Sequence, residues 1–273
     1  MLRKELAAGD AAAALATASE EVIFKIDIPA NRYDMLCLEG IARALNVFRG
    51  RAAPPAYTLA PRAPGAATPT PVRITVRPET ALVRPFIVAA VLRGVALDAE
   101  RYASLIDLQD KLHQNLCRQR SLVAIGTHDL ATLRVPFTYE ALPPADVAFV
   151  PLKQDREWRA DELLAHYAAN DQKLRRFVPL LAGSLVVPVV LDADRRVASL
   201  PPVINGARSA ISLATRDILI ECTATDLAKV RWFYYVYYFF LSLLFHHLFT
   251  LLNSFLLSIY CGFFVHISSL THS

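Results

Sequence analysis

Hydrophobic and polar positions recur with clear periods along the middle of the chain, and they predict a sheet with helices around it. Short apolar runs that end at turn residues predict strands at 72–79, 85–97, 121–130, 184–192, 197–205 and 217–225. Residues 100–120 have an apolar side at helical spacing, formed by Tyr102, Leu105, Ile106, Leu108, Leu112 and Leu116. A second helix is predicted at 157–170, with an N-cap near Asp155. Strands outnumber helices and are often adjacent, so the pattern predicts an α+β fold in which helices flank a mixed β-sheet.

The N-terminal part carries a separate strand-to-helix pattern. Residues 21–28 alternate like a strand, and Pro29-Ala30-Asn31 breaks it. Asp34 is placed to cap the following helix, and Arg32 and Asp34 are placed to fix the turn by hydrogen bonds. The helix has an apolar stripe of Leu36, Leu38, Ile41 and Leu45.

Composition divides the chain into five parts. An alanine-rich lead-in covers 1–20, a partial N-terminal module 21–50, a Pro/Ala-rich linker 51–71, the main domain 72–231 and a hydrophobic tail 232–273. The lead-in has no long apolar core and carries acidic residues, so it makes a poor signal or transit peptide.

The hydrophobic tail differs from the rest of the chain. All 29 Lys and Arg and all 25 Asp and Glu residues precede Trp232. The apolar stretch at 232–267 is longer than the roughly 20 residues that span a bilayer. The abrupt composition change, after a Lys229-Val230-Arg231 triplet whose codons can contain a splice donor, favours a translated intron or a shifted frame over a membrane anchor. The tail's four histidines are irregularly spaced without carboxylates, which disfavours a metal site.

Charge and cysteine content set weaker limits. A net charge of +4 permits contact with an anion such as RNA without requiring it. Cys37, Cys117, Cys222 and Cys261 are far apart and form no C-x-x-C pair. This spacing predicts reduced thiols in a cytoplasmic protein and disfavours zinc binding.

Long segments of the chain carry a resemblance to a known family. "DIPANRYDMLCLEGIARAL", "RPFIVAAVLRGV", "LQDKLHQNLCRQRSLVAIGTHDL", "PFTYEALPPADVAFVPL", "SLPPVINGARSAISL" and "ILIECTATDLAK" follow one another in order. Together they resemble the beta subunit of phenylalanyl-tRNA synthetase of the eukaryotic and archaeal type, over about residues 21 to 229. The resemblance implies a partial B1-like module at 21–50 and a B3/B4-like tRNA-editing domain at 72–231.

The resemblance also implies an activity and partners. In that family a beta subunit joins an alpha subunit in a heterotetramer, and the alpha subunit activates the amino acid with ATP and Mg²⁺. The beta subunit contacts tRNA(Phe) and hydrolyses tyrosine that was wrongly attached to it. An apolar Phe pocket rejects one added hydroxyl only weakly, so a second pocket that hydrogen-bonds this hydroxyl is physically motivated. The chain has no ATP motif, and we expect no cofactor or metal in it.

Three polar segments are implied to converge on the editing cleft. The pocket candidates are Thr127, His128, Asp129, Asn205, Gly206, Ser209, Glu221, Thr223 and Asp226. Asn205 and Gly206 would allow a tight turn and a close backbone approach to a ligand. Glu221 and Thr223 alternate on a buried strand, so their side chains share a face. A carboxylate there could recognise the tyrosyl hydroxyl or amino group, or orient water.

Each candidate has a simpler interpretation. His128 and Asp129 could form a turn that caps a strand, and Asp226 could cap a following helix. Thr127 and Thr223 could only bridge strands.

The candidates for RNA contact are Arg118, Arg120 and Arg208. Arg118 and Arg120 could equally be a solvated face, and His113 is expected at the surface. Arg208 stands where the resemblance leads us to expect His, and Arg cannot act as a neutral base. Such editing does not require a side-chain base, because positioned water and substrate hydroxyls can suffice, so we assign no nucleophile. The alternatives to an editing hydrolase are a non-catalytic tRNA-binding scaffold and a membrane-anchored relative.

Overall fold

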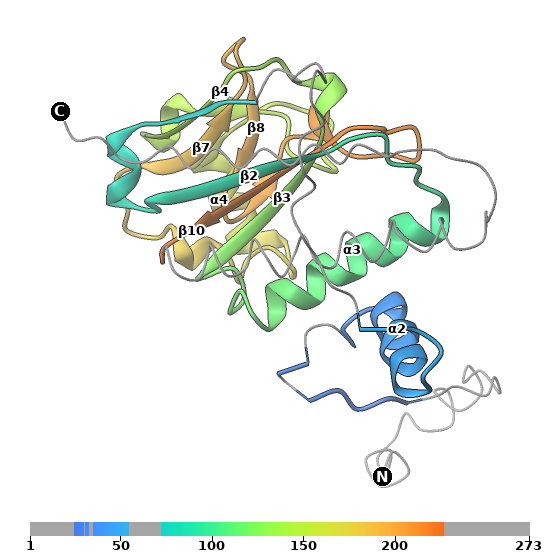
Figure 1. Ribbon diagram of the computed structural model, residues 1–273. Coiled ribbons are helices and arrows are strands. Elements are labelled where there is room, and N and C mark those ends of the chain that lie inside the picture. The colour runs from blue at the N-terminus through green and yellow to red at the C-terminus, as the bar shows by residue number, and fades with distance from the viewer. Residues whose placement is uncertain (1–24, 30, 33–34, 55–71, 227–273) are drawn as a thin grey trace, which may run out of the picture.

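The computed structural model describes residues 25–29, 31–32, 35–54 and 72–226 (Figure 1). The alanine-rich lead-in, Asp34, most of the linker and the hydrophobic tail lie outside the described residues. Within the described part, none of the helices has both the length and the hydropathy needed to cross a membrane.

Three α-helices and ten strands form the described structure. The helices are α2 (Leu38–Phe48), α3 (Ala99–Gln114) and α4 (Ala160–Asn170). The strands are β1 (Ile74–Val76), β2 (Phe86–Leu92), β3 (Val123–Asp129), β4 (Phe137–Leu142), β5 (Ala148–Phe149), β6 (Trp158–Arg159), β7 (Val187–Leu191), β8 (Val197–Leu200), β9 (Ile204–Asn205) and β10 (Ile218–Ala224). The α+β prediction is confirmed.

The strands divide into two main sheets, whereas the sequence predicted one. One sheet has five strands in the order β1-β4-β7-β8-β9, and the other has the order β2-β10-β3. β5 and β6 pair separately. The five-stranded sheet is mixed, because β1 and β4 are parallel while its other pairs are antiparallel. β10 is central in the second sheet and is buried along its whole length, so it needs a covering layer on both faces.

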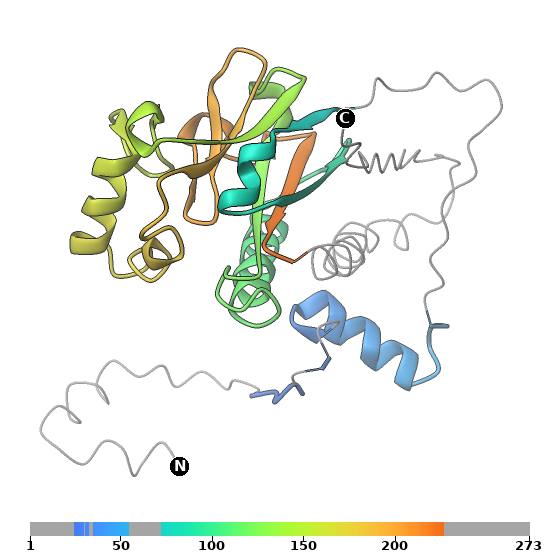
Figure 2. The same cartoon turned by 90° about the vertical axis from the view of Figure 1, so that its left-hand side faces the viewer.

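These covering layers are α3 on one face and the five-stranded sheet on the other (Figures 1 and 2). Leu105, Leu108 and Leu112 of α3 pack on the even-numbered residues of β10. Leu219 of β10 packs between the sheets with Phe137, Tyr139, Val190 and Ala198 of the five-stranded sheet. The outer face of the five-stranded sheet packs against α4, and this contact forms a further hydrophobic core besides those on the two faces of β10. The layers therefore follow the order helix, sheet, sheet, helix.

Helix α3 is capped at its start and ends earlier than the predicted Arg120. The Asp98 side chain accepts a hydrogen bond of 2.8 Å from the Arg101 amide. The helix ends at Gln114, and Arg118, Gln119 and Arg120 follow with positive φ values of 46°, 52° and 66°. Left-handed backbone cannot continue a right-handed helix, so the predicted end was wrong.

No strand was predicted at β4, β5 or β6, and two of the predicted elements differ from those observed. The predicted strand 197–205 is a hairpin of β8 and β9 that turns at Pro201-Pro202. Helix α4 begins after Arg159 without a side-chain cap, so the predicted cap near Asp155 was wrong.

The N-terminal helix packs against α3. Glu39 of α2 accepts a hydrogen bond of 2.9 Å from the Ser104 hydroxyl, and Lys111 donates to the Leu36 carbonyl at 3.1 Å. The Pro-Ala-Asn turn is present, because the Arg32 amide donates to the Pro29 carbonyl at 2.9 Å. Residues 25–28, the described part of the predicted strand 21–28, form no strand.

Candidate functional site

A group of polar side chains lies between the two sheets, where an apolar core would be expected. On β10, Glu221 and Thr223 alternate with apolar residues and are 2% and 0% exposed. The neighbouring strand β3 contributes His128, which is 0% exposed. Burial of polar groups is costly unless they are hydrogen-bonded, so the partners of these side chains are decisive.

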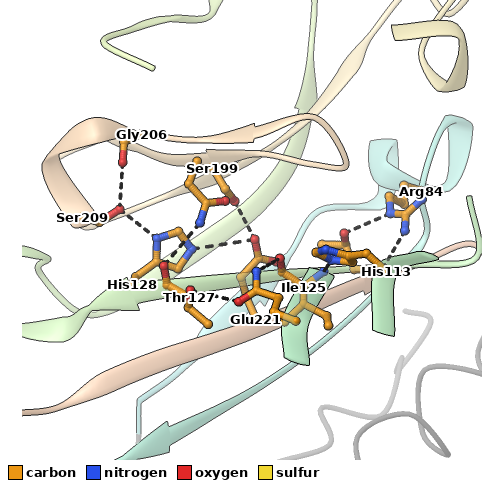
Figure 3. Close-up of polar contacts among 12 residues, drawn as sticks. Arg84, His113, Ile125, Thr127, His128, Ser199, Gly206, Ser209 and Glu221 are labelled. Carbon is orange, nitrogen blue, oxygen red and sulfur yellow. Dashed lines mark hydrogen bonds and ion pairs between the residues drawn. The ribbon is translucent and has the colours of Figure 1, made fainter. Parts of the chain in front are cut away.

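Glu221, Ser199, His128 and Ser209 form a connected polar network (Figure 3). The Ser199 hydroxyl on β8 donates to Glu221 Oε1 at 2.7 Å. His128 Nδ1 lies 2.8 Å from the Ser209 hydroxyl, and its Nε2 lies 3.9 Å from Glu221 Oε1. The network therefore joins both sheets and the segment after β9.

Two polar atoms of this network have no partner among the described residues. They are His128 Nε2 and Glu221 Oε2, and both are buried. The Ser209 hydroxyl lies 3.5 Å from the Gly206 carbonyl but only 2.8 Å from His128 Nδ1. When it donates to Nδ1, Nε2 carries the proton and faces the carboxylate. A buried polar atom without a partner costs about 1–3 kcal/mol, which a bound hydroxyl or water would recover. The network is therefore able to hold a small polar group between an acceptor and a donor.

Gly126 leaves the space that the network occupies. It lies opposite Glu221 in the β3–β10 pairing. A Cβ atom at this position would lie 2.5 Å from Glu221 Oε1 and 2.9 Å from His128 Nε2. Any side chain at 126 would displace the carboxylate or the imidazole.

Thr223 is held by a buried cation. The Arg84 Nε donates to the Thr223 hydroxyl at 2.9 Å, and Nη2 donates to the Thr223 carbonyl at 2.8 Å. Burial lowers the pKa of Arg84, whereas its electrostatic interactions with Tyr139 and Glu221 act in the opposite direction. The Tyr139 hydroxyl of β4 donates to the Arg84 carbonyl at 2.7 Å.

Thr127 and Asn205 lie at the free edge of β3 rather than in this network. The Thr127 hydroxyl donates to Gln109 of α3 at 3.4 Å, and the Asn205 amide donates to the Thr127 carbonyl at 3.3 Å. Gln109 also donates to the Ile125 carbonyl at 3.1 Å. These side chains satisfy backbone groups of an edge strand.

Asp129 stabilises the local turn, which is the simpler of the two roles considered from the sequence. Its Oδ1 accepts from the Ala131 amide at 3.0 Å, and Oδ2 accepts from the Thr215 hydroxyl at 2.7 Å. Asp226 follows β10, and the helix that it would cap lies outside the described residues.

Gly206 is close to backbone, but not in the manner expected for a tight turn. Its φ is −71°, which any residue adopts. A Cβ atom there would lie 2.8 Å from the Val197 carbonyl, because the Gly206 amide donates to Ala198 at 2.8 Å. The glycine therefore allows close packing of the segment on β8.

The three arginines proposed for RNA contact lie in different environments. Arg118 is exposed, and exposed Arg208 donates to the Thr132 carbonyl at 3.1 Å. Arg120 donates to the carbonyls of Pro202 and Val203 at 3.2 Å and 3.0 Å. Burial lowers the pKa of Arg120 to about 10. The structure thus separates Arg120 from the two exposed arginines.

His113 is buried, so the expected surface position was wrong. It is 2% exposed, and its Nε2 accepts a hydrogen bond of 2.9 Å from the Ile125 amide. Burial and the nearby Arg120, Arg84 and Arg176 lower its pKa well below the ordinary value. The imidazole serves as a neutral acceptor for the free edge of β3.

Ser199 and Arg84 are site residues that the sequence prediction missed. Ser199 lies in a predicted strand, but the register of β7 and β8 shifts between Val190 and Leu191. Alternation therefore does not show which face Ser199 occupies. Arg84 precedes Pro85 in an ordinary charged stretch, and no local signal marks it as buried.

The chemistry available is recognition of a hydroxyl rather than a serine nucleophile. A nucleophilic triad needs its carboxylate within hydrogen-bond reach of the imidazole, and 3.9 Å exceeds that reach. The described residues contain no group of three or more His, Cys, Asp or Glu that could hold a metal ion. Cys37, Cys117 and Cys222 are free thiols, and burial raises the pKa of each.

Comparison with known proteins agrees with this architecture. Residues 5–51 match the family model described as the Phe-tRNA synthetase beta subunit B1 domain, and residues 92–232 match the B3/4 domain. The cytoplasmic phenylalanine--tRNA ligase beta subunit of Arabidopsis thaliana is 58% identical over 212 residues, which are 78% of this chain and 35% of that protein. The beta subunit of Drosophila melanogaster is 52% identical over 231 residues, or 85% and 38% of the two chains.

A solved structure shares the fold. It is an N-terminal fragment of the phenylalanyl-tRNA synthetase beta subunit from Pyrococcus horikoshii, with a TM-score of 0.68 and 26% identity. The similarity covers 78% of this chain and 58% of that fragment. The chain spans little more than a third of the length of the curated relatives that it matches.

Proposed function

Because the chain belongs to the family of the phenylalanyl-tRNA synthetase beta subunit, we propose that its B3/4 domain edits mischarged tRNA. The substrate is tyrosine esterified to tRNA(Phe), and the reaction is hydrolysis of that ester. Water adds to the ester carbonyl, the bond to the ribose oxygen breaks, and tyrosine leaves the tRNA 3′ end. No side-chain nucleophile is assigned.

The observation that carries this proposal is the unpartnered pair between the sheets. Glu221 Oε2 and His128 Nε2 are buried without a partner among the described residues. A phenolic hydroxyl would donate to the first and accept from the second, whereas a phenyl ring would leave both unsatisfied. Such a site discriminates against the molecule that lacks the hydroxyl by on the order of 10⁴-fold. It would therefore select tyrosine over phenylalanine.

The buried position implies movement on binding. Glu221, His128, Ser199 and Ser209 are each at most 2% exposed. A tyrosyl side chain reaches them only when a covering segment is displaced. We assign this movement to the segment after β9, which carries Ser209 and joins the network by that one side chain.

The proposed partners of the chain are supported by its relatives, which are named phenylalanine--tRNA ligase beta subunit. The chain would assemble with an alpha subunit, which uses ATP and Mg²⁺ for amino-acid activation, and it would bind tRNA(Phe). Arg118 and Arg208 are exposed cations suited to phosphate contact. We propose a cytoplasmic location, which the name of the Arabidopsis thaliana relative supports.

The test compares deacylation of Tyr-tRNA(Phe) and Phe-tRNA(Phe) by the full chain and by Glu221→Gln. The wild type should release tyrosine and spare phenylalanine. The variant keeps the shape of the side chain but loses its charge. A hydrogen bond to a charged group contributes about 1.5–3 kcal/mol, so the tyrosine rate should fall about tenfold to a hundredfold.

Glu140→Gln is the matched control. Glu140 is also a largely buried carboxylate, but its ion-pair partner is Arg195, outside the network. It should leave the tyrosine rate unchanged. Binding of tRNA without hydrolysis by the wild type would instead support the scaffold alternative, and equal rates for both esters would refute tyrosine selection.

A further inference from the structure

Arg84 is a buried cation whose contacts are all to neutral oxygen atoms. It is 3% exposed, and among the described residues no carboxylate forms an ion pair with it. Replacing a buried charge by an apolar side chain often leaves stability unchanged or increases it. Stability alone therefore gives a weak reason for an arginine at this position.

The first group of contacts fixes the end of β10. Arg84 binds both the hydroxyl and the carbonyl of Thr223, at 2.9 Å and 2.8 Å. Thr223 is two residues from Glu221 on the same strand, and both side chains are buried. The Arg84 guanidinium therefore fixes β10 at a point two residues from the Glu221 carboxylate of the network (Figure 3).

The second group of contacts holds the left-handed turn after α3. Arg84 Nη2 donates to the Arg120 carbonyl at 3.2 Å, and Nη1 donates to the Ser121 carbonyl at 3.3 Å. Arg118, Gln119 and Arg120 all have positive φ. Non-glycine residues keep such a conformation only where their surroundings hold it. Arg84 supplies part of that hold.

The turn in turn positions the β8–β9 hairpin. The Arg120 guanidinium donates to the Pro202 and Val203 carbonyls and lies 4.2 Å from the centre of the Phe177 ring. Pro202 and Val203 form the bend between β8, which carries Ser199, and β9. Hydrogen bonds of Arg84 and Arg120 thus link β10 in one sheet to the bend that follows β8 in the other.

We propose that Arg84 and Arg120 form a strut that fixes Glu221 relative to Ser199, and that Arg84 is a positioning residue for ester hydrolysis. The proposal rests on the proposed editing function. Neither guanidinium needs to touch the substrate. The strut keeps two side chains from different sheets at the 2.7 Å separation that orients the Glu221 carboxylate. A misplacement of about 1 Å in such a site can lower the rate about a hundredfold.

The experiment measures steady-state deacylation of Tyr-tRNA(Phe) by the full chain and its variants. Arg84→Met and Arg120→Met should lower kcat about tenfold to a hundredfold, because they misplace Glu221. KM should stay within about twofold, because the strut does not contact the tRNA part of the substrate, on which ground-state binding mainly rests. Arg84→Lys should be intermediate. An ammonium retains the charge and can reach Thr223, but it cannot span to the turn carbonyls as a planar fork does.

Arg134→Met is the matched control. Arg134 is exposed and pairs with Asp194 at 3.2 Å, away from the network. It should leave kcat unchanged. A loss of kcat equal to that of Arg84→Met in this control would overturn the strut, as would a rise in KM at unchanged kcat in Arg84→Met.

Hydrogen–deuterium exchange separates the strut from the proposed function. Arg84→Met should speed exchange in peptides covering 199–206 while peptides from α4 stay as in the wild type. A wild type that hydrolyses no ester would refute editing, and the exchange result would still decide on the strut. Unchanged exchange in 199–206, or a uniform increase across the chain, would overturn it.

Discussion

The two faces of the three-stranded sheet are both buried, yet they differ in character along β10. The face toward α3 is lined on β10 by Ile218, Ile220, Cys222 and Ala224, and it packs on leucines of the helix. The face toward the five-stranded sheet carries Glu221 and Thr223 on the same strand. One strand therefore contributes to an ordinary apolar core and to a polar network at once.

The difference shows where the fold is built and where it is able to act. Apolar packing against α3 gives stability without further requirements. The face between the sheets buries a carboxylate, an imidazole and a guanidinium, and two of its polar atoms lack partners among the described residues. Sites that bind a ligand often accept such a cost, which the ligand then offsets.

The largest expected effect lies on the apolar face. Leu108→Ala should lower the free energy of unfolding by about 3 kcal/mol, because Leu108 is 0% exposed and its removal leaves a cavity beneath β10. Urea unfolding of the full chain measures it. Leu213→Ala, at a side chain that is 50% exposed, is the control and should cost little. The comparison of faces fails if Leu108→Ala, still folded, loses hydrolysis as Glu221→Gln does.

The polar face is tested most directly at Gly126. Gly126→Ala should reduce deacylation of Tyr-tRNA(Phe) about a hundredfold, because its Cβ would lie 2.5 Å from Glu221 Oε1 and force the carboxylate aside. The clash should also lower the stability of Gly126→Ala. The double variant Gly126→Ala/Glu221→Asp has a shorter carboxylate side chain, which relieves the clash and should restore part of that stability. A Gly126→Ala protein with the wild-type rate would show that the carboxylate position does not matter.

His113 gives a pH-dependent contribution on the α3 face. Its pKa is well below the ordinary value of about 6.5 in the folded protein, whereas the unfolded chain protonates near that value. The unfolded state therefore binds one proton more than the folded state as pH falls. The neutral His113 thus contributes to the free energy of unfolding above about pH 6.5, and this contribution is lost as pH falls below that value.

Between about pH 7.5 and about pH 5.5, His113 should account for a loss on the order of 1 kcal/mol in the free energy of unfolding, because its pKa is lowered by burial in the folded protein. The measurement is urea unfolding at both pH values in the wild type and in His113→Gln, whose amide oxygen can still accept from Ile125. The variant should lose less stability on acidification. Equal losses in both proteins would contradict the neutral, buried imidazole.

The smallest effect concerns the start of α3, outside both faces. Asp98→Ala should cost about 1 kcal/mol, since it removes the acceptor of the Arg101 amide at 2.8 Å. Asp98→Asn should retain most of the stability. Thermal unfolding distinguishes them, and an Asn variant as unstable as the Ala variant would rule out the cap as the cause.

Periodicity predicted the parts of the fold that depend on local pattern. The apolar side of residues 100–120 identified the buried leucines of α3, and the apolar run at 217–225 identified β10. Both predictions hold because a helix or strand with one strong hydrophobic pattern has few ways to bury it. The predicted end of α3 was wrong. Three left-handed residues follow the helix, and no Gly or Pro in the sequence indicates them.

The candidate site was predicted only in part, because its members lie far apart in sequence. The motif resemblance placed His128, Ser209 and Glu221 together, and the structure connects them. It did not indicate Arg84 or Ser199, which reach the network from other strands. Nor did it separate His128 from Thr127, whose side chain contacts α3.

The sequence by itself determined the helices, most strands, the family and the two polar positions of β10. Only the tertiary structure decided that the strands form two facing sheets, that Gly126 leaves room for Glu221, and that a buried arginine links both sides of the site. The physical reason is that hydrophobic periodicity reports which face of an element is buried. What lies against that face depends on contacts between residues distant in the chain, and these form only when the layers pack.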